Sequence, residues 1–219
     1  MGGRPGGELP PGSAVLRFRL NEAAAALARR CASRWLSLGL VAAIAVVDLV
    51  LLSRPFGFTL RGLLDEPCHL ATGLVVLGTV TRWRGRPPSA PFTWGLVVMS
   101  VAIDLDHLPA ELAARDLLYG SLARPYTHAL WTLALLIVIA LAAHLRARAG
   151  ARLRSAFTAL LFAGAALGLA AHFFRDLVTA PISLLWPLSA AGLQLPYGWY
   201  LGPVILLALL PLPLRPRPR

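Results

Sequence analysis

The chain has 219 residues, of which 57% are hydrophobic and 14% are charged. Soluble domains are roughly half apolar and about one-quarter charged, so this composition excludes an ordinary soluble protein and indicates a bilayer as the solvent. The net charge is +11, and all 21 basic residues are arginines that lie between apolar runs rather than in one patch. Arginines in the loops between apolar segments are typical of a membrane protein, whose orientation they set. We therefore expect no nucleic-acid partner.

The first 34 residues form a basic lead-in to the apolar part of the chain. Residues 1–13 are rich in glycine and proline, and we expect them to be disordered. Residues 14–34 carry five arginines around an alanine-rich stretch, where Asn21 and Glu22 are a candidate helix start. We therefore predict that residues 1–34 are a disordered or amphipathic cytoplasmic segment, which could lie on anionic lipid.

Six apolar segments follow, and most approach the roughly 20 residues that a spanning helix needs. The predicted fold is all-α: a polytopic transmembrane helical bundle at 35–214, followed by a basic tail at 215–219. Residues 179–197 are predicted to be a short re-entrant or surface segment. The six predicted spans are 35–52, 63–80, 92–109, 126–145, 156–175 and 198–214.

The arginines predict how this bundle is oriented. The N-terminal segment, the second loop, the fourth loop and the C-terminal tail together hold 16 arginines, and the rest of the chain holds 5. Because basic residues are retained in the cytoplasm, both termini are predicted to lie inside. Loops one, three and five are then predicted to lie outside.

Acidic residues and histidines gather in four short clusters, each at the predicted outer end of a helix. Since the topology rests on arginines alone, this agreement is independent support for a shared polar site. The clusters are Asp65 to His69, Asp104 to His107, His128 with the nearby Arg124, and His172 to Asp176. Within the clusters, residues three or four apart share a helix face. Asp106 would point elsewhere on a regular helix, but Pro109 could disturb the helix end and turn it inward.

This set of side chains suits a metal site. Imidazole together with carboxylate favours Zn²⁺, Mn²⁺ or Fe²⁺ over Ca²⁺. Two ions could clamp a phosphoryl group, and Arg124 and Arg175 beside the cluster could bind a phosphate through paired hydrogen bonds. The competing interpretation is that ionisable residues at helix ends are simply solvated. Two interpretations of Asp48 stay open: it could orient a ligand histidine, or it could simply lie at a solvated helix end.

At these clusters the sequence resembles the bacterial inner-membrane metal-dependent hydrolases, a family of small polytopic proteins. The resemblance covers most of residues 66–188, and the order and spacing of its motifs make it specific. The motifs are His69-x-x-x-Gly73, Asp104-Leu105-Asp106-His107, Arg124-Pro125-Tyr126-Thr127-His128, His172-x-x-x-Asp176-x-x-Thr179 and Leu184-Leu185-Trp186-Pro187. It implies an integral inner-membrane protein with a metal-dependent hydrolase site. The metal ligands that it implies are His69, Asp104, Asp106, His107, His128, His172 and Asp176.

We therefore expect a hydrolase of a lipid-like or phosphorylated substrate at the outer leaflet, with one or two divalent ions, zinc or manganese. Arg124 and Arg175 would bind the anionic group, and Glu66 would be the general base. One alternative is a non-catalytic protein whose metal ties four helices together. Another is a transporter component, although transport sites usually lie near the midplane and this cluster is predicted at helix ends. Membrane lipid is an expected partner.

Overall fold

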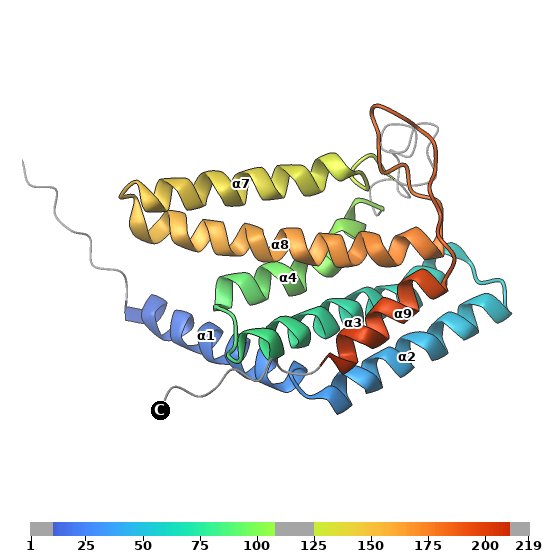
Figure 1. Ribbon diagram of the computed structural model, residues 1–219, viewed down its shortest axis with the longest axis horizontal. Coiled ribbons are helices and arrows are strands. Elements are labelled where there is room, and N and C mark those ends of the chain that lie inside the picture. The colour runs from blue at the N-terminus through green and yellow to red at the C-terminus, as the bar shows by residue number, and fades with distance from the viewer. Residues whose placement is uncertain (1–10, 108–124, 211–219) are drawn as a thin grey trace, which may run out of the picture.

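The computed structural model describes residues 11–107 and 125–210, and within them the protein is all-α, as predicted (Figure 1). The one β pairing in these ranges is an isolated bridge between Ile182 and Leu193. The helices are α1 (Pro11–Cys31), α2 (Arg34–Ser53), α3 (Phe58–Arg84), α4 (Ala90–Ala102), the 3₁₀ turn η1 (Ile103–Asp106), α7 (Leu130–Arg148), α8 (Arg152–Thr179) and α9 (Gly198–Leu209).

Helices occupy all six predicted apolar segments, but they differ in length. Four helices in the described ranges, α2, α3, α7 and α8, are long and apolar enough to cross a membrane. Helix α4 has 13 residues before the chain tightens into η1, and α9 has 12 residues. The structure thus gives a helical bundle with four candidate spans. The count of six spans and the cytoplasmic position of both termini stay predictions.

Helix α1 begins at Pro11, so the predicted start near Asn21 is wrong. Proline suits the first turn of a helix, because its missing N–H would have no partner there and its φ angle is already helical. Ala24, Ala28 and Cys31 on α1 are buried against α3 and α4. The later part of the basic segment is therefore a packed helix.

The two ends of the bundle differ in chemistry. Helices α7 and α8 lie side by side and are joined by a short turn (Figure 1). Arg146 and Arg148 lie in the last turn of α7, at the end where α8 begins. His172 and Asp176 lie near the other end of α8. The arginine-rich turns and the histidine and aspartate clusters are therefore at opposite ends of this helix pair.

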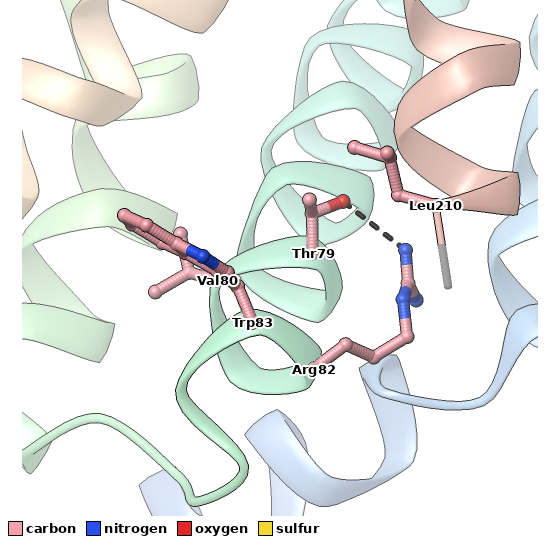
Figure 2. A pocket seen from close by; sticks show the side chains of 5 residues that line it. All are labelled: Thr79, Val80, Arg82, Trp83 and Leu210. Atoms are coloured by element: carbon pink, nitrogen blue, oxygen red, sulfur yellow. Dashed lines mark hydrogen bonds between the residues drawn. The ribbon is translucent and has the colours of Figure 1, made fainter. Parts of the chain in front are cut away.

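Arg82 ties four helices together at the arginine-rich end, since its Nη1 also donates to the Cys31 carbonyl of α1 at 3.5 Å. Its Nη1 donates to Ser37 Oγ (3.1 Å), and its Nη2 donates to Thr79 Oγ1 (3.1 Å) and to the Leu207 carbonyl (2.6 Å). Figure 2 shows the guanidinium of Arg82 beside Thr79 and Leu210, in a pocket between α3 and the end of α9. A cation there is favourable, because the last carbonyls of a helix carry partial negative charge.

Glycines allow α4 and α8 to pack with their backbones in close contact. A Cβ at Gly95 on α4, or at Gly164 or Gly168 on α8, would overlap a backbone carbonyl oxygen of the opposite helix. Small residues permit this approach between membrane helices. His172 follows Gly168 by four residues on α8, and α4 leads directly into η1. The glycine contact therefore sets how near His172 lies to the residues of η1.

We predict that Gly164→Ala destabilises the protein by about 1–3 kcal/mol, because the added methyl group must displace the backbone of α4. Gly39→Ala is the matched control, since no atom lies within 4 Å of a Cβ built at this exposed helical glycine. The control should be neutral or slightly stabilising, because alanine favours helix over glycine. Thermal unfolding in detergent, followed by circular dichroism, measures both. Equal unfolding temperatures for the two variants would contradict the close contact.

Candidate metal centre

The four sequence clusters meet at one site within the bundle. His69 comes from α3, Asp104 from η1, His128 from the residues before α7, and His172 and Asp176 from α8. Helices α3 and α8 extend beyond the predicted segments, to Phe58 and Thr179 respectively. The site is therefore deeper in the bundle than the predicted helix ends, and its three histidines are at most 1% exposed.

Asp104, His128, His172 and Asp176 form what we call the inner group, whose ligand atoms all lie within 4.8 Å of one another. His172 Nε2 is 3.1 Å from Asp176 Oδ2 and 3.4 Å from Asp104 Oδ1. His128 Nε2 is 3.0 Å from Asp104 Oδ1 and 3.6 Å from Asp176 Oδ2. Four ligands at 2.0–2.1 Å around a tetrahedral ion would be about 3.4 Å apart. These four distances are close to that value, so the inner group is compact enough to surround one ion.

Asp104, Asp106, His107 and His128 form a second set, the outer group. His107 Nδ1 is 2.9 Å from Asp106 Oδ1 and 3.4 Å from Asp104 Oδ1. His128 Nδ1 is 3.4 Å from Asp106 Oδ2. The helix tightens at Ile103 into the 3₁₀ turn η1, and this change of pitch places Asp106 beside His107 and His128. The two groups share Asp104 and His128.

The orientation of His172 would suit coordination of a metal ion. Its Nδ1 lies 3.0 Å from the Ser100 carbonyl oxygen. A carbonyl only accepts hydrogen bonds, so this contact assigns the ring proton to Nδ1. In the neutral ring the Nε2 lone pair then points at Asp104 and Asp176. A metal-binding histidine is commonly fixed through its other ring nitrogen in this way.

Several buried polar atoms of the cluster make no hydrogen bond to the described residues. These atoms are both ring nitrogens of His69, Nε2 of His172, Nδ1 of His128 and Oδ1 of Asp106. Buried polar atoms are almost always hydrogen-bonded, so this concentration in one place calls for an explanation. Coordination to a cation would use these lone pairs. The donor set of imidazole and carboxylate also fits Zn²⁺ or Mn²⁺, so the residues present fit a divalent ion.

His69 lies at the edge of the cluster and belongs to neither group. Its Nε2 is 3.5 Å from Asp176 Oδ1, 3.6 Å from Asp65 Oδ2 and 3.9 Å from Asp104 Oδ2. Its ring stacks on His172 with centroids 3.9 Å apart. His69 therefore faces the far oxygens of two inner-group carboxylates. Its predicted role as a ligand stays a prediction.

Two members of the outer group lie outside the candidate spanning helices, and their contacts shift their pKa values. Burial opposes ionisation of Asp106, but the adjacent His107 and His128 rings and the Thr127 hydroxyl outweigh it and lower the pKa of Asp106 to about 2. Burial also disfavours a charged His128 ring, but the hydrogen bond with Asp104 and the nearby Asp106 carboxylate outweigh this and raise its pKa. Asp106 is thus a carboxylate at neutral pH, and the Thr127 hydroxyl donates to it.

A buried ionic network adjoins the metal centre. The guanidinium of Arg175 donates to both oxygens of Asp48, at 2.7 and 3.1 Å, and through Nε to Asp65 at 3.0 Å. The Tyr197 hydroxyl donates to Asp48 at 2.5 Å. Asp48 is therefore the buried partner of Arg175, which neither sequence-based interpretation of it anticipated. Asp65, which was not among the predicted site residues, joins this network to His69.

The three residues predicted to act in catalysis differ in their surroundings. Glu66 is half-buried and lies beside the carboxyl group of Asp104. Arg175 is engaged by two carboxylates. Arg124 lies outside the described residues. The proposed chemical roles of all three stay predictions.

Residues 180–197 fold back over the start of α7. The Leu130 amide donates to the Leu184 carbonyl at 2.9 Å. The Trp186 ring stacks on Tyr126, with centroids 4.3 Å apart. Tyr126 is two residues before His128, so this contact secures the segment that carries the histidine. The Leu-Leu-Trp-Pro motif of the sequence thus packs against the segment that carries His128.

The model of the YdjM inner membrane protein family matches residues 64–216, which is more than half of the chain. This range contains every residue of the inner and outer groups. Neither a curated protein nor a solved structure matches the chain. Together with the apolar helices, the match makes this a multi-pass protein of the bacterial inner membrane.

We predict that Asp48→Asn lowers stability by about 3–5 kcal/mol, because it removes one carboxylate from a buried ionic network. Glu22→Gln is the control, since Glu22 is exposed on α1 and its change should cost less than about 0.5 kcal/mol. Thermal unfolding of the two variants in the same detergent compares them. An unchanged unfolding temperature for Asp48→Asn would show that the network contributes little to the fold.

Proposed function

We propose that this chain, which belongs to the YdjM inner membrane protein family, is a metal-dependent hydrolase of a lipid-like or phosphoester substrate. The observation that supports this most strongly is the inner group. Two histidines and two aspartates from distant parts of the chain bring their ligand atoms within 4.8 Å of one another in a buried site. Ionisable groups at membrane depth are costly, and they usually mark a functional site.

The donor set determines the chemistry that we assign to the site. We propose that Asp104, His128, His172 and Asp176 hold a divalent ion, zinc or manganese. A divalent ion bound at this centre would polarise a phosphoryl or carbonyl oxygen and so supply the Lewis acid of a hydrolytic reaction. The Ser100 carbonyl keeps Nε2 of His172 directed at the ion position, so the ligand needs no rearrangement to bind.

Glu66 is the proposed general base. It lies beside Asp104 and is half-buried, so its carboxylate adjoins both the metal ligands and the accessible side of the site. A base in this place could take a proton from the attacking water, which typically contributes about 10²- to 10⁴-fold to the rate. The substrate is proposed to enter at the outer leaflet, because the arginine distribution predicts that this end of the bundle faces the periplasm.

Anion binding is assigned to Arg124 rather than shared with Arg175. The Arg175 guanidinium already donates to Asp48 and Asp65, so a phosphate would have to displace a buried carboxylate to reach it. We therefore propose that Arg175 positions the site by holding Asp65 next to His69.

A structural metal site is the second candidate. The inner group provides four protein ligands, and structural zinc sites are usually closed by four, whereas catalytic ones keep a position for water. In that case the ion would only tie α8, η1 and the start of α7 together. A transporter component stays a weaker alternative, since no described observation favours it.

We predict that Glu66→Gln lowers kcat by about 10²-fold or more, because the general base is lost. The bound metal should be retained, because Glu66 is not a ligand of the inner group. His128→Ala should abolish turnover and lower the metal content. His144→Ala is the control, since His144 is exposed on α7. Purified protein loaded with Zn²⁺ or Mn²⁺ would be assayed on phospholipids and lipid phosphates, with metal content measured by mass spectrometry.

The outcomes separate the two candidates. Full metal content with no turnover on any substrate would count against the hydrolase and favour the structural site. Loss of folded protein in His128→Ala, with no turnover in the folded wild type, would do the same. Wild-type turnover in Glu66→Gln would overturn only the assignment of Glu66 as the general base.

A further inference from the structure

We infer that the centre has two unequal metal positions, a closed inner one and an open outer one, which share Asp104. This inference rests on the proposed function, because it presumes that the cluster binds metal. The inner position uses Asp104, His128, His172 and Asp176, and the outer one uses Asp104, Asp106 and His107.

The ring of His128 separates the two positions. Its Nε2 faces Asp104 and Asp176, at 3.0 and 3.6 Å, and its Nδ1 faces Asp106 at 3.4 Å. A neutral imidazole offers one lone pair, so it serves one ion at a time. The inner group needs this ring to reach four ligands, which leaves the outer group with three. A site with three protein ligands keeps a coordination position open, as catalytic sites do.

Burial divides the positions in the same way. The side chains of His128, His172 and Asp176 are completely buried. Those of Asp106 and His107 are 16% and 15% exposed. An ion at the inner position would be enclosed by protein and slow to leave, whereas an ion at the outer position could exchange with solvent and meet a substrate.

Charge also favours a second ion. Asp104, Asp106 and Asp176 carry three negative charges when ionised, and neutral histidines add none. One divalent cation would leave one negative charge in excess, and an unbalanced buried anion is costly. Two divalent cations would balance these three charges together with that of the neighbouring Glu66 carboxylate, so a second ion would neutralise the centre. Two ions could also clamp a phosphoryl group, which suits a phosphorylated substrate.

The test counts ions and measures how fast they leave, independently of activity. Detergent-purified full-length protein would be equilibrated with Zn²⁺, freed of unbound ion, and analysed by mass spectrometry before and during treatment with a chelator. Titration with Mn²⁺, followed by electron paramagnetic resonance, would detect a second ion coupled to the first. The variants are His107→Ala for the outer position, His172→Ala for the inner position and His144→Ala as the control.

We expect about two ions per chain in the wild type and in His144→Ala, one released rapidly and one slowly, because the ligands Asp106 and His107 are partly exposed whereas His128, His172 and Asp176 are fully buried. His107→Ala should lose the rapidly released ion and the coupled manganese signal, and should keep the slow ion. His172→Ala should lose the slow ion. If His172→Ala does not fold, His107→Ala still decides the question, because its side chain is partly exposed.

Different failures have different meanings. No bound metal in the folded wild type would overturn both this inference and the proposed function, and would indicate that protons neutralise the carboxylates. A single ion in the wild type, with no second Mn²⁺ binding event up to millimolar concentration, would overturn the inference of two metal positions and leave the proposed function standing. Two ions retained in His107→Ala would overturn the assignment of the outer position.

Discussion

The structure depends on how buried carboxylates are neutralised near one end of a helical bundle. Asp48 and Asp65 lie against the guanidinium of Arg175, while Asp104 and Asp176 face imidazole rings. An unpaired charge is costly in a low-dielectric interior, so each carboxylate constrains the helix that carries it. These constraints bring α2, α3, η1 and α8 to one place, and they make the polar site part of the fold.

The carboxylates paired with Arg175 and those facing histidines lie next to each other, and α3 and α8 contribute residues to both sets. Arg175 and Asp176 are consecutive on α8, so one faces the ionic network and the other faces the histidines of the inner group. On α3, Asp65 contacts both Arg175 and His69. Close packing of α4 on α8 through glycines then sets the distance between η1 and His172. A change in any of these contacts would therefore alter the geometry of the inner group.

The sequence predicted the all-α fold, and it placed a helix on each of the six apolar segments, because runs of apolar residues are a strong local signal. It missed the glycine contacts of α4 and α8, although Gly164 and Gly168 have the four-residue spacing of small residues that membrane helices use. It also left the role of Asp48 open. The partner of Asp48 is 127 residues away in the chain, and local spacing carries no information about such a pair.

Composition and local pattern determined that this protein lies in a membrane, that it contains several apolar helices, and that most of its histidines and aspartates belong to short clusters. Those properties depend on hydropathy and on the spacing of residues three or four apart, and both can be read from short stretches of the sequence. Only the tertiary structure decided which atoms face one another. It separated the inner from the outer group, engaged Arg175 with two carboxylates, and placed the site deeper than the predicted helix ends, because packing between distant helices sets these relations.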